Sequence, residues 1–528
     1  MAYAINPILR GFNPDPSILR VGEDYYIATS TFEWFPGVQI HHSKDLVHWE
    51  LICHPLDRLS QLNMIGNPSS GGVWAPCLSY CDGTYYLIFT DVKTVFGMFK
   101  DTHNYLVTAK DIMGPWSDPI YLNSSGFDPS LFHDSDGRKW LVNMLMDYRP
   151  WNNDFGGIVL QEYSDKEQKL IGEAKLVFKG THIGCTEGPH LYKHNGYYYL
   201  LVAEGGTSYE HAESMARSKN IDGPYEIDPK TPIITSRYNE KLPIQKSGHA
   251  SIVETPEGDW YMVHLCGRPV NKEKMCILGR ETCIQAVEWR DGWLRMKHTD
   301  NTPQEKVNIP SASHDGGELI DFVEDFNKDK WSIHLQSLRV PLGSSASLTE
   351  RPGYFRLYGG ESMSSCHHQS LLAHRQQHFH FTADTLIEFN PNSFQQMAGL
   401  IYYYDNVSYY YLYISYDEET GKTLNLLSSV LGKVSCPIGR GVSIDKATQI
   451  YLKLTCSAEE AQFSYSLDGK NFKNIGPILD ATVLSDDYYT KIDEYRFTGA
   501  FIGICCQDLS GQRKYADFDY LKYKELEE

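Results

Sequence analysis

Residues 187–203 read EGPHLYKHNGYYYLLVA, which is a short apolar strand, a tight turn and a second strand rich in aromatic residues. The turn contains Asn195 and Gly196, residue types that favour a β-hairpin. Four other stretches follow the same plan: NPDPSILRVGEDYYIAT (13–29), WAPCLSYCDGTYYLIFT (74–90), FDPSLFHDSDGRKWLVNM (127–144) and GHASIVETPEGDWYMVHL (248–265). The first half of the chain therefore carries five copies of one hairpin unit.

The five copies are regularly spaced along the chain. Their turn glycines are Gly22, Gly83, Gly137, Gly196 and Gly258, which lie 54 to 62 residues apart. A period of about 40–60 residues filled with strands and turns is typical of radial β repeats, and helical periodicity is nearly absent through residue 300. The sequence predicts an all-β protein in which residues 1–310 form a five-bladed β-propeller.

The propeller geometry indicates where functional side chains would gather. The first strand of each blade lies nearest the axis, so equivalent strand starts converge on one end of the central channel. The residues that open the repeats are Asp15, Trp74, Asp128, Glu187 and His249. We therefore expect three carboxylates, one indole and one imidazole to face a common cavity.

A local turn is an alternative role for two of these acids. An Asp before Pro-Ser, as at Asp15 and Asp128, often accepts hydrogen bonds from nearby backbone amides in a turn. Glu187 does not fit this explanation, because Glu is a poor turn former. Three acids at repeat openings also cost free energy through like-charge repulsion and desolvation, which favours a functional trio over a packing role.

The composition excludes some classes of partner. The 528-residue chain has 48 Lys and Arg against 67 Asp and Glu, a net charge of −19, which argues against nucleic acid or an anionic membrane as the main partner. The first residues show no signal-peptide pattern, and no apolar run approaches the ~20 residues that span a bilayer. The scattered cysteines have no zinc spacing, so we expect a reduced, cytoplasmic protein.

The second half of the chain has a different pattern. Residues 301–317 are polar and contain Pro, Ser and Gly, as a linker does. Beyond them, short strand-like runs such as AGLIYYY (398–404), QIYLKLTC (449–456) and GAFIGICC (499–506) are separated by turns such as Asp468-Gly469. This pattern predicts a β-sandwich of the jelly-roll or lectin-like kind over residues 318–528. A carbohydrate-binding module is one role for such a domain.

Several motifs in a fixed order resemble glycoside hydrolase family 43, in its bacterial β-xylosidase branch. They are NPDPS (13–17), TSTFEWFPGVQIHHSKDLVHW (29–49), GGVWAP (71–76), GFDPSLFHD (126–134), TEGPHLY (186–192) and LGRET (278–282), together with FTGAFIG (497–503) and YADFDYLKYKEL (515–526). Each motif is moderately specific by itself. Their order and spacing make the match strong, and it covers nearly the full chain.

The resemblance implies an inverting exo-glycosidase that releases D-xylose from the non-reducing end of β-1,4-xylo-oligosaccharides. It implies that Asp15 is the general base that activates water and that Glu187 is the general acid that protonates the leaving oxygen. Asp128 is then the third carboxylate, which raises the pKa of the acid and orients it. The residues alone indicate only the trio; the separate roles come from the resemblance.

The resemblance also implies five further pocket residues, each with an alternative. Phe32 and Trp74 resemble walls for the terminal sugar but also fit a propeller core, and His249 resembles the central histidine of the family but also fits a structural role. Arg280 resembles a sugar-contacting arginine, with a surface salt bridge as its alternative. Phe497 resembles a residue by which the sandwich closes one side of the pocket, although a sandwich core position explains it nearly as well.

Other functions stay open at this point. The same trio serves α-L-arabinofuranosidases in the family, so an arabinofuranosidase or a dual activity is the main alternative, followed by a non-catalytic carbohydrate-binding propeller. No cofactor is expected to be required and no metal ligand is predicted, although some relatives hold a cation near the residue corresponding to His249. Relatives of this size imply a homo-oligomer, with a xylo-oligosaccharide as the substrate partner.

Overall fold

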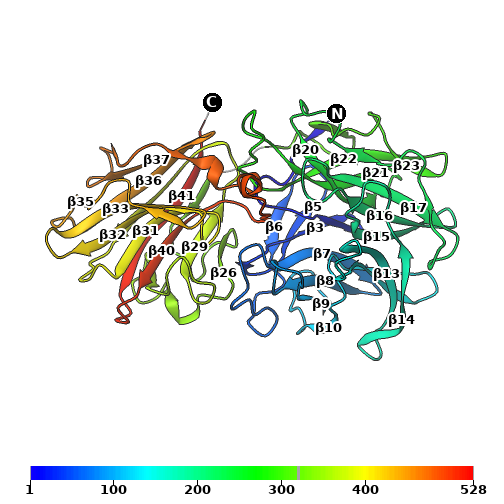
Figure 1. The fold of residues 1–528 in the computed structure, drawn as a ribbon, viewed down its shortest axis with the longest axis horizontal. Coiled ribbons are helices and arrows are strands. Elements are labelled where there is room, and N and C mark those ends of the chain that lie inside the picture. Colours follow the sequence, from blue (N-terminus) through cyan, green and yellow to red (C-terminus); the bar gives the residue numbers. More distant parts are fainter. Residues whose placement is uncertain (1, 318–320, 527–528) are drawn as a thin grey trace.

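The computed structural model describes residues 2–317 and 321–526, and it has two β lobes (Figure 1). Helix is confined, in this part of the chain, to α1 (Asp486–Tyr489) and three 3-10 turns, η1 (Gly343–Ser345), η2 (Ala481–Val483) and η3 (Thr490–Ile492). None of the helices in the described ranges is long and apolar enough to cross a membrane. The limits expected for the second domain, residues 318 and 528, lie outside the described residues, as does residue 1.

The first lobe contains five antiparallel sheets, one for each repeat. The first blade consists of β2 (Ser17–Val21), β3 (Asp24–Thr29), β5 (Gln39–Ser43) and β6 (Glu50–Cys53). The second consists of β7 (Gly72–Cys81), β8 (Thr84–Val92), β9 (Thr102–Ala109) and β10 (Ile120–Asn123). The third consists of β11 (Ser130–His133), β12 (Lys139–Met146), β13 (Phe155–Ser164) and β14 (Lys169–Phe178).

Two more sheets complete the lobe. The fourth blade consists of β15 (Glu187–His194), β16 (Tyr197–Glu204), β17 (Ala212–Ser218) and β18 (Glu226–Ile227), with β19 (Ile234–Thr235) also paired to β17. The fifth consists of β20 (Gln245–Glu254), β21 (Trp260–Gly267), β22 (Glu281–Arg290) and β23 (Trp293–Met296). The first strands contact one another in the circular order β2, β7, β11, β15, β20 and back to β2. The predicted five-bladed propeller is confirmed.

The two ends of the propeller are tied together. β1 (Ala2–Ile5) pairs antiparallel with β24 (Lys306–Ile309), in register from Ala2 opposite Ile309 to Ile5 opposite Lys306. Buried apolar residues from both strands join those of the first and fifth blades in one cluster. The start of the chain thus closes the ring against the segment that leaves it.

The second lobe is a sandwich of two nine-stranded sheets. One sheet contains β25 (Phe322–Glu324), β27 (Ala346–Ser347), β28 (Phe355–Tyr358), β30 (His380–Glu388), β36 (Ile450–Ser457), β37 (Glu460–Ser466), β38 (Lys473–Asn474), β39 (Leu479–Asp480) and β41 (Tyr515–Glu525). The other contains β4 (Trp34–Phe35), β26 (Leu335–Leu338), β29 (Ser370–Arg375), β31 (Gln396–Tyr403), β32 (Tyr409–Asp417), β33 (Gly421–Val430), β34 (Lys433–Ser435), β35 (Val442–Ser443) and β40 (Phe501–Asp508).

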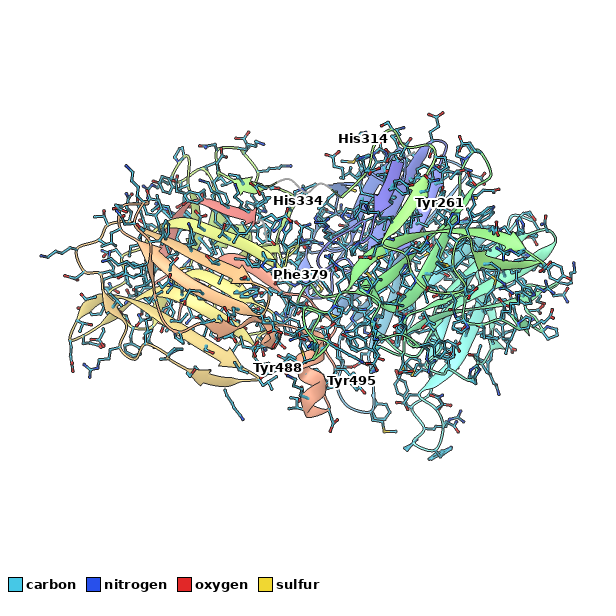
Figure 2. The ribbon with its side chains drawn as sticks, turned by 90° about the horizontal axis from the view of Figure 1, so that it is seen from above. Tyr261, His314, His334, Phe379, Tyr488 and Tyr495 are labelled. Carbon is cyan, nitrogen blue, oxygen red and sulfur yellow. The ribbon has the colours of Figure 1, made fainter. Side chains whose placement is uncertain are left out.

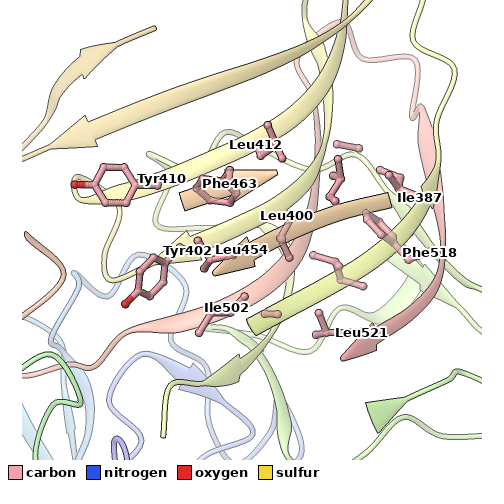
Figure 3. Close-up of a cluster of buried hydrophobic side chains, with 14 of the residues drawn as sticks. Ile387, Leu400, Tyr402, Tyr410, Leu412, Leu454, Phe463, Ile502, Phe518 and Leu521 are labelled. Carbon is pink, nitrogen blue, oxygen red and sulfur yellow. The ribbon is translucent and has the colours of Figure 1, made fainter. Parts of the chain in front are cut away.

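Alternate residues of the long sandwich strands point into the space between the two sheets. Figure 3 shows Ile387, Leu454 and Phe518 from one sheet packed against Leu400 and Leu412 from the other. All of them are at least 99% buried. The period-2 pattern of the sequence therefore builds a separate core, and the predicted β-sandwich is confirmed.

The two lobes share a sheet. β4 belongs to the propeller segment by sequence, yet it pairs with β26 at the edge of a sandwich sheet. Trp34 of β4 is fully buried and stacks on Phe501 of β40, with ring centroids 3.7 Å apart. Figure 2 places Phe379, beneath the Arg268 guanidinium, at the junction of the lobes as well. The sandwich is therefore fixed against the propeller.

Candidate active site

Five residues occupy equivalent positions around the propeller axis. Asp15, Ala75, Asp128, Gly188 and His249 all have a left-handed backbone, with φ between 36° and 56°. The first four are each followed by proline, and His249 is followed by Ala250. They line an axial cavity of about 10 Å³, which is the space of one water molecule.

The expected ring was wrong in register at two blades. Trp74 and Glu187 each lie one residue before the equivalent position, which Ala75 and Gly188 occupy. Glu187 resembles Asp15 and Asp128 in charge, but in the first four blades the equivalent backbone position is the residue before proline. In the second and fourth blades the pairing register shifts at this point, between Trp74 and Cys77 and between Glu187 and His190. Such bulges re-aim side chains.

Gly188 shows why glycine follows the acid in TEGP. Its φ is +56°, and a Cβ built on it would lie 3.2 Å from the His249 ring. A side chain here would be strained by the backbone and crowded by the imidazole. Glycine therefore lets Glu187 and His249 come from neighbouring blades to the same end of the channel.

Asp15 is buried and held at both carboxylate oxygens. The Ser30 hydroxyl donates to Oδ2 at 2.6 Å, and Arg280 Nη1 donates to Oδ1 at 2.9 Å. The His249 Nδ1 lies 3.8 Å from Oδ1. All three partners are distant from Asp15 in sequence or come from another blade, so its carboxylate is oriented for a site rather than used for its own turn.

Asp128 and Glu187 are buried together. The Gly188 backbone N–H donates to Asp128 Oδ2 at 3.0 Å, which joins the third and fourth blades. Burial raises the pKa of Glu187 to about 8, and the charge of Asp15 adds to this, while Lys100 and Arg280 act in the opposite direction. Burial, followed by the charges of Glu187 and Asp15, raises the pKa of Asp128 well above its usual range.

The raised pKa values have one chemical consequence. The repulsion between Glu187 and Asp128 is reciprocal, so ionisation of either carboxyl raises the pKa of the other. The pair therefore retains a proton near neutral pH, which is the state that a general acid needs. Asp15 is held in a fixed orientation by the Arg280 guanidinium and the Ser30 hydroxyl.

Aromatic rings surround this group of acids. Trp74 contacts Phe32 at 5.7 Å and Phe497 at 5.5 Å between ring centroids. Ser70 fixes two of the rings, because its carbonyl accepts from Trp74 Nε1 at 2.9 Å and its hydroxyl accepts from the Phe497 N–H at 3.0 Å. Apolar rings next to a few oriented polar groups are typical of a small-molecule pocket. The sandwich supplies Phe497, which is half-buried.

Phe127 also belongs to these rings, although the sequence analysis missed it. Its ring packs edge-on against Trp74, with centroids 5.4 Å apart. The signal was present in the sequence, since Phe127 precedes Asp128-Pro129 as Trp74 precedes Ala75-Pro76.

Arg280 and His249 complete the site. Arg280 is buried; besides Asp15 it donates through Nη2 to the Phe497 carbonyl at 2.9 Å, and its guanidinium lies 5.1 Å above the Phe32 ring. Burial lowers the pKa of His249, which keeps its ring neutral at neutral pH. Within residues 2–317 and 321–526 no group of three or more His, Cys, Asp or Glu side chains is arranged to hold a metal ion.

We expect activity to decline on the alkaline side as Glu187 loses its proton. Because burial raises the pKa of this carboxyl to about 8, the acid form is present below that pH and disappears as the pH rises through it. A profile of kcat/KM against pH should therefore have an alkaline limb near pH 8. A limb below about pH 6 would contradict this expectation.

Comparison with known proteins gives full-length matches. Residues 4–294 match the model of glycosyl hydrolases family 43, and residues 323–524 match that of the beta xylosidase C-terminal concanavalin A-like domain. A beta-xylosidase of Bacillus subtilis is 51% identical, covering 98% of this chain and 99% of that protein. A xylosidase/arabinosidase 43B of Humicola insolens is 50% identical, covering 100% and 98%. The crystal structure of a xylan beta-1,4-xylosidase from Bacillus halodurans has a TM-score of 0.96 at 55% identity, covering 99% and 100%.

Proposed function

This chain belongs to glycoside hydrolase family 43, and we propose that it is an exo-acting, inverting β-xylosidase that releases D-xylose from the non-reducing end of β-1,4-xylo-oligosaccharides. The observation that carries the proposal is that the buried carboxyls of Glu187 and Asp15 have different surroundings. Burial raises the pKa of Glu187 to about 8, while Asp15 is held by Arg280 and Ser30. In the proposed mechanism Glu187 retains the proton that it donates, and Asp15 is held in position to accept one.

The proposed reaction is a single displacement. Asp15 removes a proton from a water molecule as that water attacks the anomeric carbon, and Glu187 donates its proton to the leaving glycosidic oxygen. The bond to the leaving sugar breaks as the bond to water forms, and the configuration inverts. The enzyme is ready for another turnover after Asp15 has lost its proton and Glu187 has regained one.

Exo action is supported by the contribution of the sandwich. Phe497 comes from the second lobe and contacts Trp74 of the propeller, while its carbonyl accepts from Arg280. A group from the sandwich thus lies beside the aromatic wall and limits one side of the site. A pocket limited in this way accepts a chain end in preference to a long chain passing through.

Hydrolysis of xylobiose, followed by NMR from the earliest time points, tests the proposal. We expect α-xylose to appear first from the cleaved non-reducing unit, ahead of its equilibration with the β anomer, because inversion converts the β linkage into an α product. Early release of β-xylose from that unit would contradict the base role of Asp15. The absence of xylose would refute the β-xylosidase function.

α-L-Arabinofuranosidase activity is the second candidate, and one observation favours it. A 50% identical relative carries the name xylosidase/arabinosidase. Rates on aryl β-xylopyranoside and aryl α-arabinofuranoside, measured with one enzyme preparation, decide between a single and a dual activity. A homo-oligomer and a cytoplasmic location stay predictions of the sequence, as does the independence from a cofactor.

A further inference from the structure

Asp486 of the sandwich lies against the outer side of Arg280. Its Oδ2 is 4.0 Å from Arg280 Nε. The other two guanidinium nitrogens donate to Asp15 and to the Phe497 carbonyl, whereas Nε is buried and has no hydrogen-bond partner among the residues that the structure describes. Asp486 is thus a second carboxylate for the arginine that orients Asp15, and it faces the nitrogen that lacks a partner.

The start of α1 holds Asp486 firmly in this place. The Tyr404 hydroxyl donates to Asp486 Oδ1. The next residue, Asp487, accepts from Lys246 Nζ at 2.6 Å and from the Cys276 N–H at 2.9 Å, and both of these donors belong to the propeller. The helix lies between the two lobes in Figure 1. The position of Asp486 is therefore set by the sandwich and by the propeller together.

We propose that Asp486 is a positioning residue of the active site, which holds the Arg280 guanidinium from its Nε side and so fixes the group that orients the general base. This proposal rests on the glycosidase function proposed above. It assigns the sandwich a part in the electrostatics of catalysis, in addition to the steric part of Phe497.

The charge of Asp486 has a second effect. The charged and titratable groups that face it are Arg280, Lys246, Tyr404 and Asp487, and burial raises the pKa of Asp486 to about 7. Its negative charge therefore develops around neutral pH and is present in the range of the alkaline limb. Arg280 lowers the pKa of Glu187, so an ionised Asp486 that offsets the arginine charge helps Glu187 keep its proton as the pH rises.

The test is Asp486→Asn, assayed on xylobiose from pH 5 to pH 9. Asparagine keeps the shape and an oxygen for the Tyr404 hydroxyl but never becomes charged. We expect kcat to fall about three- to tenfold, with a smaller change in KM, because positioning is lost rather than substrate contact. We also expect the alkaline limb to move to lower pH, because the charge of Arg280, which lowers the pKa of Glu187, is no longer offset by a neighbouring carboxylate.

Asp487→Asn is the matched control, because it changes the neighbouring residue of the same helix. It leaves buried Lys246 without its Asp487 partner, so we expect a lower Tm. Because the charge of Asp487 raises the pKa of Asp486, its removal favours the ionised form of Asp486, and the alkaline limb should not move to lower pH. Tyr404→Phe removes the donor to Asp486 and delays its ionisation. We expect it to move the alkaline limb in the same direction as Asp486→Asn, but by less.

The outcomes separate the two proposals. An active wild-type enzyme with an Asp486→Asn variant whose profile and kcat match it would overturn the role of Asp486 alone. Equal shifts in the Asp486→Asn and Asp487→Asn profiles would also overturn it, because they would reflect a general disturbance of α1. A wild-type protein without glycosidase activity would refute the function itself.

Discussion

Asp15→Asn is expected to lower kcat for xylobiose by about 10²- to 10⁴-fold, the contribution typical of a well-placed general base. The asparagine oxygen can still accept from Ser30 or Arg280, the two groups that hold Asp15 now, so the pocket should keep its shape. What is lost is the ability to take a proton from water. Stopped assays at saturating xylobiose measure the loss, with KM expected to change little.

The same variant should lose activity on every leaving group. Water must be activated whether the leaving group is a sugar or an acidic phenol, so hydrolysis of 2,4-dinitrophenyl β-xyloside should fall as steeply as that of xylobiose. Asp134→Asn is the matched control, because Asp134 is also buried but is bonded to Lys193 and Tyr198. An Asp15→Asn variant that retains more than about a tenth of the wild-type kcat would exclude the base role.

Glu187→Gln should have an effect of similar size on xylobiose, about 10²- to 10⁴-fold in kcat, but one that depends on the leaving group. The glutamine cannot supply the proton that a sugar oxygen needs in order to leave. A dinitrophenolate leaves without protonation, so the loss on the dinitrophenyl xyloside should be no more than about tenfold. The ratio of the two losses identifies the general acid.

The alkaline limb gives a second readout of the acid. With the titrating carboxyl of Glu187 removed, the limb expected near pH 8 should disappear from the residual activity on xylobiose, whose leaving group needs the proton. Glu204→Gln is the control, since Glu204 is a buried glutamate of the same blade that accepts from Thr181, Thr186 and Ser214. Equal losses on the two substrates would assign Glu187 a structural role.

The propeller fold was predictable because the sequence repeats one hairpin unit five times. Hairpin glycines at regular spacing and period-2 alternation are local signals, and each blade satisfies them by itself. The ring position in the fourth blade was predicted one residue too early, because Glu187 resembles Asp15 and Asp128 in charge. The residue with the equivalent left-handed backbone is Gly188, which precedes proline as those two aspartates do. Phe127 was missed for the same reason.

Contacts across the two lobes were harder to derive. Phe497 was found only through the family resemblance, and Asp486 was not found at all, because its partner Arg280 is distant in sequence and belongs to the other lobe. No local pattern marks a carboxylate that faces a buried guanidinium from another domain. The pairing of β4 with β26 is of the same kind, since a two-residue strand carries no periodicity.

That short strand has a consequence for how this architecture is inherited. The propeller contributes β4 to a sandwich sheet and Trp34 to the packing of that sheet. Each lobe therefore depends on the other to cover part of its surface. Recombination at the linker would leave one partner with an unpaired sheet edge and the other with an exposed indole. The two lobes are therefore expected to be inherited together as one unit.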